Sequence, residues 1–121
     1  MNANFSKNTL DKQDFSEFEQ QASRAADFLR TLGNAHRLQV LCLLIEHKEL
    51  SVGQMLECTT LSQSALSQHL GKMREEGLIS YRRDAQTLYY SLSSPVVIEI
   101  IAVLKTHFCP STDVPPDTAK P

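Results

Sequence analysis

Residues 62–92 read SQSALSQHLGKMREEGLISYRRDAQTLYYSL, and the spacing of apolar residues changes within this stretch. Its first half has three apolar residues at helical spacing, which are Leu66, Leu70 and Met73. Gly77 is a helix-stop residue, and the runs LISYRR (78–83) and TLYYSL (87–92) that follow alternate with a period of two. The stretch therefore predicts a helix that starts at Ser62, followed by a β-hairpin.

Three further helices are expected before this stretch. Ser16 and Glu19 have the spacing of a capping box and precede an apolar series that ends at Gly33. Asn34 can cap a second helix, in which seven of the eight residues in 38–45 are apolar, as in a helix surrounded by protein. A short third helix is predicted to begin at Ser51, close to the helix that follows it.

One more helix is expected after the hairpin. Ser94 and Pro95 are suited to a cap and a first helical turn, and eight of the nine residues in 96–104 are apolar. A terminal helix that is apolar on all sides requires a partner. Four helices, two strands and a helix make a mainly α chain with a small β-hairpin. This order predicts a winged helix-turn-helix, with the helix from Ser62 as recognition helix and the hairpin as wing.

Length and composition limit the possible classes of protein. The 121 residues fit one domain, and 41% hydrophobic against 21% charged residues is an ordinary globular balance. We expect a folded domain at 15–109 between disordered tails at 1–14 and 110–121, the second of which holds four of the five prolines. The sequence shows neither a run of about 18 apolar residues nor a secretory signal, which predicts a cytoplasmic protein without a membrane partner.

The motifs of catalysis are missing from the sequence. It contains no Ser/His/Asp set, no glycine-rich phosphate loop and no paired-carboxylate motif. We therefore expect no enzyme, no catalytic residues and no cofactor.

The predicted recognition helix has an outward face that is polar and rich in amides. Glutamine pairs with two atoms of adenine, and serine bonds to several bases. The net charge of the chain is -2, yet residues 62–83 carry four Lys or Arg against two Glu, so positive charge is concentrated locally. We expect base contacts from Gln63, Ser64, Ser67 and Gln68. Contacts to phosphates or the adjacent minor groove are expected from His69, Lys72, Arg82, Arg83 and Gln86.

Two alternatives to DNA contact stay open at this point. A polar helix face with arginines beside it is also what a solvated surface looks like, and many winged helices bind protein instead of DNA. For His69, packing against the protein is as reasonable as a phosphate contact.

Four segments of the chain resemble the ArsR/SmtB family of bacterial winged-helix repressors, and they are GNAHRLQVLCLL, ELSVGQML, LSQSALSQHLGKMREEGLI and RRDAQTLYYSL. The resemblance covers roughly residues 20–108 and is more specific than a general helix-turn-helix pattern. Members of the family are homodimers that bind inverted-repeat operator DNA and release it when an inducer binds. The resemblance therefore implies a dimeric repressor with double-stranded operator DNA as partner.

Departures from the family pattern reduce the number of inducer classes that fit this sequence. Arsenic, lead and cadmium sensors carry Cys-x-Cys in the segment that here reads ELSVGQML, which contains no cysteine. Zinc and nickel sensors place paired ligands on the last helix, but Glu99 and His107 are eight residues apart, about 12 Å along a helix, too far to hold one ion. A metal-sensing repressor with a site built from His107, Cys109 and another cysteine stays open as an alternative.

Cys42 and Cys109 resemble the thiol pair of the persulfide-responsive branch of this family, the BigR, SqrR and HlyU type. In that chemistry a persulfide oxidises one thiolate, and a second thiol resolves it into a disulfide or a longer polysulfide bridge. The resemblance implies a redox-sensing pair with a persulfide or polysulfide inducer. The alternative for Cys42 is a small core residue. Cys58 matches nothing in that branch and is expected to be incidental.

Overall fold

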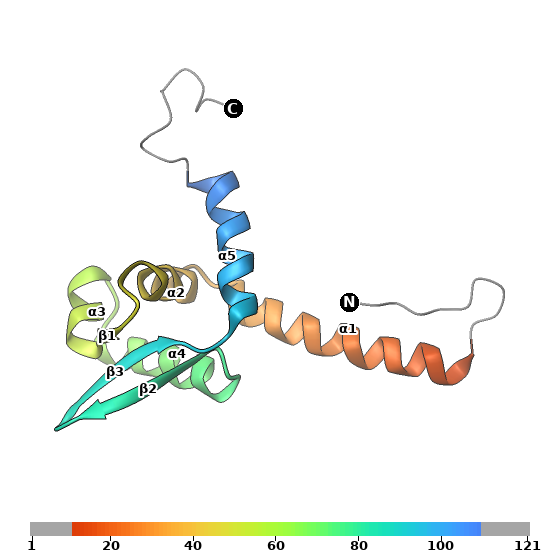
Figure 1. Cartoon of the computed structure of the whole chain (residues 1–121), viewed down its shortest axis with the longest axis horizontal. Coiled ribbons are helices and arrows are strands. Elements are labelled where there is room, and N and C mark those ends of the chain that lie inside the picture. The colour runs from red at the N-terminus through yellow and green to blue at the C-terminus, as the bar shows by residue number, and fades with distance from the viewer. Residues whose placement is uncertain (1–10, 110–121) are drawn as a thin grey trace, which may run out of the picture.

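The computed structural model describes residues 11–109, and residues 1–10 and 110–121 lie outside the described part. Its helices are α1 (Lys12–Leu32), α2 (Ala35–His47), α3 (Val52–Cys58), α4 (Gln63–Glu75) and α5 (Pro95–Phe108). Its strands are β1 (Leu50–Ser51), β2 (Ile79–Asp84) and β3 (Thr87–Leu92). The elements form one body from which α1 and α5 project in different directions (Figure 1). The predicted winged helix-turn-helix is confirmed.

The caps of α2 and α4 lie where the sequence predicts them. The Asn34 side chain accepts a hydrogen bond of 3.0 Å from the backbone N–H of Arg37, and the Ser62 hydroxyl accepts one of 3.1 Å from that of Ala65. Each bond satisfies a backbone donor that the first helical turn leaves unpaired. Gly77 follows α4 with a φ of 78°, a left-handed conformation that favours glycine and ends the helix.

One predicted helix start differs from the structure, and another agrees with it in position. The side chain of Asp11 caps α1, so Ser16 lies inside the helix and is not its cap. Residues 12–14 were assigned to the tail by their polarity, but they are helical. A helix whose first turn is exposed carries no apolar period that could mark its start. Ser94 occupies the cap position of α5 without a side-chain hydrogen bond, and the fixed φ of Pro95 begins that helix.

A third strand joins the hairpin and was not predicted. β1 pairs antiparallel with β3, placing Leu50 opposite Tyr90 and Ser51 opposite Tyr89, so the strand order is β1-β3-β2. Two residues are too few to show an alternating pattern. Ser51 also forms a reciprocal capping box with Gln54 of α3, so the sheet edge fixes where α3 begins.

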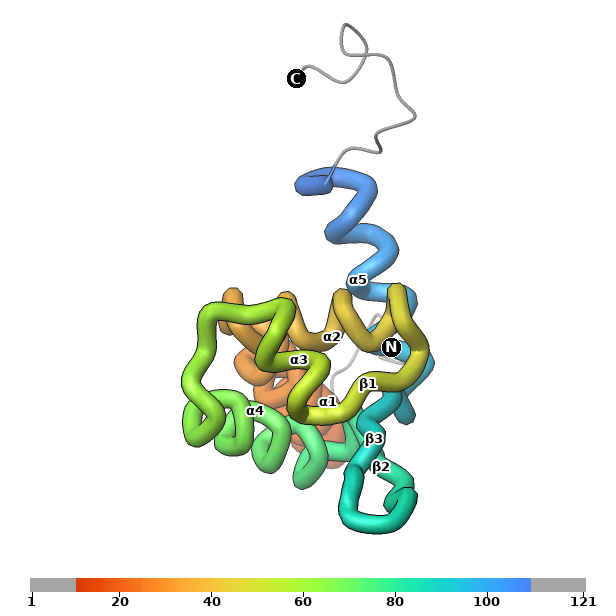
Figure 2. The backbone as a smooth tube through the Cα atoms, turned by 90° about the vertical axis from the view of Figure 1, so that its left-hand side faces the viewer, coloured from red at the N-terminus to blue at the C-terminus, as the bar shows by residue number. Residues whose placement is uncertain are grey.

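The hydrophobic core lies where α2, α4, α5 and the sheet meet. The apolar stripe of α4 is its inner face, since Leu66, Leu70 and Met73 are each at most 2% exposed. Val97 and Ile101 of α5 are equally buried. With its inner face fixed in this way, α4 lies on the same side of the body as the hairpin, and α5 rises on the opposite side (Figure 2).

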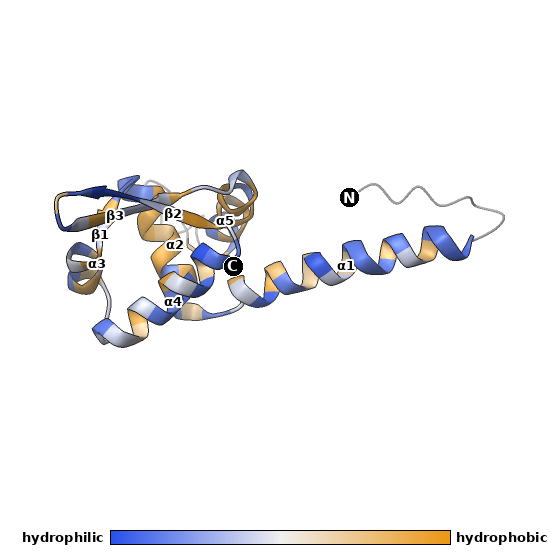
Figure 3. Cartoon of the chain, turned by 90° about the horizontal axis from the view of Figure 1, so that it is seen from below, coloured by the Kyte–Doolittle hydropathy of each residue, from blue (hydrophilic) through white to orange (hydrophobic). Residues whose placement is uncertain are grey.

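The projecting helices leave apolar side chains in solvent. Leu29 of α1 is 57% exposed, and Val103 and Phe108 of α5 are 58% and 77% exposed. Hydrophobic residues recur between hydrophilic ones along α1, and they dominate α5 (Figure 3). None of the helices in the described range 11–109 is long and apolar enough to cross a membrane.

Candidate nucleic-acid interface and thiol site

The first two turns of α4 present polar side chains to solvent. Gln63, Ser64, Ser67 and Gln68 are all exposed, as the sequence predicts, while the opposite face of the helix is buried. Amide and hydroxyl groups are the ones that bond base edges in the major groove. The face therefore has the chemistry of a recognition helix.

The wing tip and α4 enclose a cleft of about 500 Å³. Gln63 and Ser67 line it from α4, and Gln86 and Thr87 line it from the hairpin. The start of α3 closes the third side. Three of the predicted DNA-contact residues therefore meet in one concave surface, although Gln86 lies far from the other two in the sequence.

The two arginines of the wing have different surroundings. Arg82 donates from Nε and Nη2 to the two carboxylate oxygens of Glu49, at 2.7 and 2.9 Å. Its guanidinium also lies 4.6 Å from the centre of the Tyr89 ring. The hydrogen bond from Arg82 holds the pKa of Glu49 below its ordinary value. Arg83 is exposed, and within residues 11–109 no carboxylate pairs with it.

The other two cations of residues 62–83, Lys72 and Arg74, have partners too. Lys72 Nζ lies 3.1 Å from a carboxylate oxygen of Glu76, one helical turn away. The guanidinium of Arg74 lies 5.0 Å from the centre of the Tyr81 ring, which joins α4 to β2. Within the described part of the chain, only the pairing of Arg82 with Glu49 lowers the positive charge below the count over residues 62–83, since that count already includes Glu76 and a tyrosine ring carries no charge.

His69 lies between α4 and the start of α2. Its Nδ1 accepts a hydrogen bond from Arg37 Nη1 at 3.3 Å, and its ring centre is 6.1 Å from that of His36. Burial lowers the pKa of His69, and the charges of Arg37 and His36 lower it further. The structure places this half-buried imidazole in the packing between two helices, away from the exposed face of α4. That position favours the packing alternative for His69 over a phosphate contact.

Arg37 ties three elements together. Its Nε donates to the backbone carbonyl of Thr31 at the end of α1, at 2.6 Å. Its other nitrogens reach His69 on α4 and the carbonyl of Arg30, the latter at 3.4 Å. No sequence pattern identifies Arg37, because its partners are set by packing and not by spacing.

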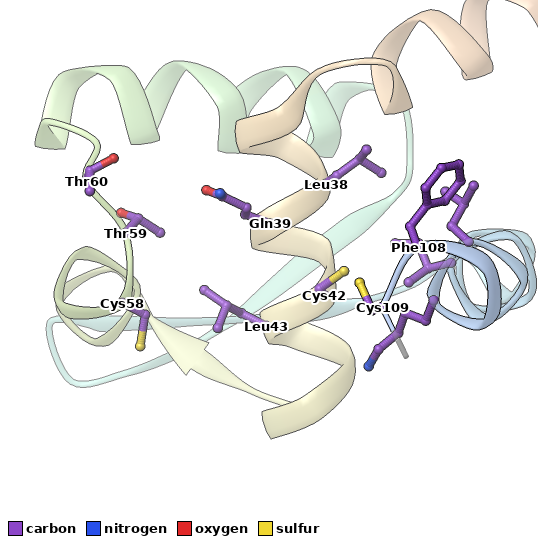
Figure 4. Close-up of a pocket in the computed structure, with 12 residues that line it drawn as sticks. Leu38, Gln39, Cys42, Leu43, Cys58, Thr59, Thr60, Phe108 and Cys109 are labelled. Atoms are coloured by element: carbon purple, nitrogen blue, oxygen red, sulfur yellow. The ribbon is translucent and has the colours of Figure 1, made fainter. Parts of the chain in front are cut away.

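Cys42 and Cys109 lie together in a pocket of about 590 Å³ between α2, α5 and the connection from α3 to α4. Their sulfur atoms point toward each other, whereas the sulfur of Cys58 points away (Figure 4). Cys42 is half-buried, and Cys109 is exposed just past the end of α5. The two cysteines that the resemblance singles out therefore line the same pocket.

The environment of Cys42 shifts its ionisation. Burial raises the pKa of the Cys42 thiol, the ammonium of Lys105 lowers it, and Cys109 and Glu46 raise it again. The net shift is upward.

Cys58 lines the same pocket, at the C-terminal end of α3. Cys58 was expected to be incidental, because it matches nothing in the persulfide-responsive branch of the family. The fold brings α3 beside α2, so three cysteines share one cavity.

The structure does not support the alternative metal site. In the described part of the chain, no three His, Cys, Asp or Glu side chains come close enough together to hold one ion. A site from His107, Cys109 and a further cysteine is therefore not formed.

Comparisons with known proteins agree with this geometry. Residues 34–81 match the family model described as bacterial regulatory protein, arsR family. The transcriptional activator HlyU of Vibrio cholerae is 44% identical over 93 residues, which are 77% of this chain and 85% of that protein. The chain belongs to the ArsR family. The regulator YgaV of Escherichia coli is 41% identical over 80% of this chain and 98% of its own length.

Solved structures of the family superpose well on this ArsR-family protein. Reduced HlyU from Vibrio cholerae gives a TM-score of 0.71 at 44% identity, over 77% of this chain and 97% of that one. The transcriptional repressor BigR from Xylella fastidiosa gives 0.70 at 33% identity, over 79% and 97%. The relatives are transcriptional regulators, and DNA is the partner of the family. The expectation of a DNA-binding protein that is not an enzyme is confirmed.

The buried position of Cys42 predicts a pH profile for its reactivity. In a Cys58→Ser/Cys109→Ser variant, the rate of alkylation of Cys42 by iodoacetamide is expected to rise with pH around a midpoint above the ordinary thiol value, because burial disfavours the thiolate. Lys105→Met is expected to move the midpoint higher, and Lys105→Arg to leave it nearly unchanged. Mass spectrometry of the alkylated protein measures the rate. The same variant in denaturant is the control, and a folded midpoint at or below the denatured one contradicts the prediction.

Proposed function

We propose that this protein is a transcriptional repressor that leaves its operator when a persulfide oxidises Cys42 and Cys109. The observation that carries the proposal is the shared pocket in which the two thiols face each other from α2 and from the end of α5. Its relatives support it, since they include the biofilm growth-associated repressor of Xylella fastidiosa and a HlyU whose structure is of a reduced form. Such a protein acts in the cytoplasm, where thiols are kept reduced.

The DNA-binding surface consists of α4 and the tip of the wing. Gln63, Ser64, Ser67 and Gln68 read bases from the first turns of α4, the part of a recognition helix that enters the major groove. Lys72, Arg83 and Gln86 hold phosphates beside it. Arg82 has a smaller part in this surface, because Glu49 already neutralises its charge.

The functional unit is a homodimer formed through α1 and α5. Both helices expose large apolar side chains that solvent does not favour. A two-fold dimer places its two recognition helices about one helical turn of DNA apart, near 34 Å, so the operator is an inverted repeat.

The switch is an oxidation of the two thiols by one organic persulfide. The thiolate of Cys109, the more exposed thiol, attacks the terminal sulfur of R–S–S–H. The S–S bond of the reagent breaks, and R–S⁻ leaves and takes up a proton. The thiolate of Cys42 then attacks the Sγ of the Cys109 persulfide, and hydrosulfide leaves. Two thiols have lost two electrons to the sulfane sulfur, and the products are a disulfide, R–S–H and H₂S.

The bridge joins the helix that forms the dimer to the helix that supports α4. Arg37 at the start of α2 donates to His69 on α4, so a movement of α2 reaches the recognition helix. Cys109 ends α5, whose exposed face contacts the second protomer in the proposed dimer. A Cys42–Cys109 bridge therefore changes the spacing of the two recognition helices. A disulfide that closes the loop from Cys42 to Cys109 contributes about 4 kcal/mol to the free energy of unfolding, because it restricts the unfolded chain. This contribution can offset strain in the bridged state.

The different partners of Arg82 and Arg83 predict different DNA-binding defects. Arg83→Ala is expected to weaken binding to operator and to mixed-sequence duplex alike and to lower the salt slope by about one. Arg82→Ala is expected to do so less, because Arg82 is paired with Glu49. Gln68→Ala is expected to cost about 1 to 3 kcal/mol on the operator and little on other DNA. Titrations at several salt concentrations measure all three. Equal losses on both DNAs for Gln68→Ala contradict its assignment to base readout.

The exposed apolar face of α5 predicts the oligomeric state. The wild-type protein is expected to sediment as a dimer at micromolar concentration. Val103→Asp is expected to give a folded monomer that binds its operator weakly, since Val103 is 58% exposed in the single chain. Ser80→Asp, at an exposed position on β2, is the matched control and is expected to stay dimeric. A wild-type monomer with an intact fold contradicts the dimer.

The switch predicts a selective loss in Cys109→Ser. Cys109 lies at the exposed end of α5, so this variant is expected to keep the melting temperature and the operator affinity of the reduced protein. It is expected to lose release from the operator by an organic persulfide. Gel shifts before and after treatment measure release, and mass spectrometry identifies the bridge in the wild type. Cys58→Ser is the control and is expected to respond like the wild type.

Hydrogen peroxide and zinc are tested in parallel with the persulfide. Persulfide release that persists in Cys109→Ser places the sensing chemistry elsewhere and contradicts the proposal. Release of the wild type by zinc and not by persulfide favours a metal sensor instead.

A further inference from the structure

The pocket around the thiols is larger than their chemistry requires. Its volume of about 590 Å³ is in the range of pockets that hold small organic molecules. Bridging two thiols that already face each other needs room for one or two sulfur atoms. Most of the pocket therefore remains to be explained by something other than the bridge.

The pocket extends across α2, with one end on each side of the helix (Figure 4). At one end lie Cys42 and Cys109, with Leu38 pointing toward Phe108 (Figure 4). At the other end, Gln39 and Leu43 point from α2 toward the connection that carries Thr59 and Thr60 (Figure 4). The thiols occupy one end, and the other end reaches the segment that leads into α4.

The lining combines an apolar wall with one cation. The wall consists of Leu38, Leu43, Ile101, Leu104 and Phe108. Lys105 is half-buried in the lining, one helical turn before Cys109, and its ammonium acts on the ionisation of Cys42. No carboxylate side chain lines the pocket as the structure describes it over residues 11–109. Such a lining suits a ligand with an apolar body and an end on which negative charge develops during the reaction.

We propose that this pocket is a binding site for organic persulfides with an apolar substituent, and this inference rests on the proposed function. The terminal S–H group lies between Cys42 and Cys109, and the Lys105 ammonium beside it stabilises the R–S⁻ that leaves. The substituent crosses α2 toward Leu43. The covalent step remains the one given above: the Cys109 thiolate takes the terminal sulfur, and the apolar thiol R–S–H is the leaving group. Substituents that carry charges, as in glutathione persulfide, lose hydration against the apolar wall without gaining a partner.

The far end of the pocket gives the substituent a second contact. Thr59 and Thr60 belong to the connection between α3 and α4, directly before the Ser62 cap of α4. A substituent long enough to reach them lies against the turn that positions the recognition helix.

The experiment compares a series of n-alkyl persulfides with glutathione persulfide on the reduced, full-length protein. The second-order rate constant for modification of Cys109 is measured by quenched-flow mass spectrometry, and release from operator DNA is measured in parallel. From ethyl to hexyl persulfide the rate constant is expected to rise by up to about fourfold for each methylene that becomes buried, and at least about tenfold over the series. Glutathione persulfide is expected to react no faster than the ethyl compound.

A filled pocket provides the decisive variant. Gln39 is exposed on α2 and lines the far end of the pocket, so Gln39→Trp is expected to occupy the space of the substituent. The variant is expected to keep the ethyl rate constant and to lose the rise toward hexyl. Glu57→Trp is the matched control, because Glu57 is exposed on the neighbouring α3 but does not line the pocket, and it is expected to keep the rise. Melting temperature and operator affinity of the reduced variants confirm their folds.

The outcomes separate this inference from the function on which it rests. Equal rate constants across the alkyl series, or a rise that survives in Gln39→Trp, overturn the binding site while release by persulfide leaves the switch intact. Failure of every persulfide to release the wild type from DNA overturns the switch and the binding site together. A rise in the wild type that is lost in Gln39→Trp and kept in Glu57→Trp supports the proposal.

Discussion

Val40, Leu41 and Leu44 of α2 are almost completely withdrawn from solvent, so α2 must be covered by other elements on most of its circumference. The structure covers it with the end of α1, with β3 and with α5. Burying large aliphatic side chains of this kind contributes about 1.5 to 3 kcal/mol each, which makes α2 the element that the rest of the fold cannot lose. One face of α2 stays partly exposed to solvent. Cys42 lies on this face and lines the pocket between α2 and α5.

The same helix also connects the thiols of the proposed switch to the recognition helix α4. At its start Arg37 holds the last turn of α1 through the carbonyl of Thr31 and contacts His69 on α4. Five residues further along, Cys42 lines the same pocket as Cys109 from the end of α5. A chemical change at the second point has a short path of direct contacts to the recognition helix, because one rigid helix carries both. This path is part of the proposed switch. The cysteine variants test whether oxidation of the thiols changes DNA binding through α4.

The recognition surface shows how far charge alone can guide a site assignment. Arg82 and Arg83 are adjacent and chemically identical, yet alternation along β2 turns one toward Glu49 and Tyr89 and leaves the other in solvent. An exposed ion pair of this kind adds little to stability. In the proposed DNA complex its greater effect is on binding, since it reduces the positive charge that Arg82 offers to a phosphate.

The elements of this fold could be predicted from neighbouring residues, because caps and periods are local. Asn34, Ser62 and Gly77 mark helix ends by their own hydrogen bonds or backbone conformation, and the stripe of α4 follows from its spacing. The start of α1 and the strand β1 could not be predicted, because an exposed helical turn and a two-residue strand carry no period. The ion pair of Arg82 with Glu49, the packing of His69 and the pocket shared by three cysteines were decided by the three-dimensional arrangement. Each joins residues that are far apart in the chain, and their contact depends on how helices enclose α2, which no local pattern encodes.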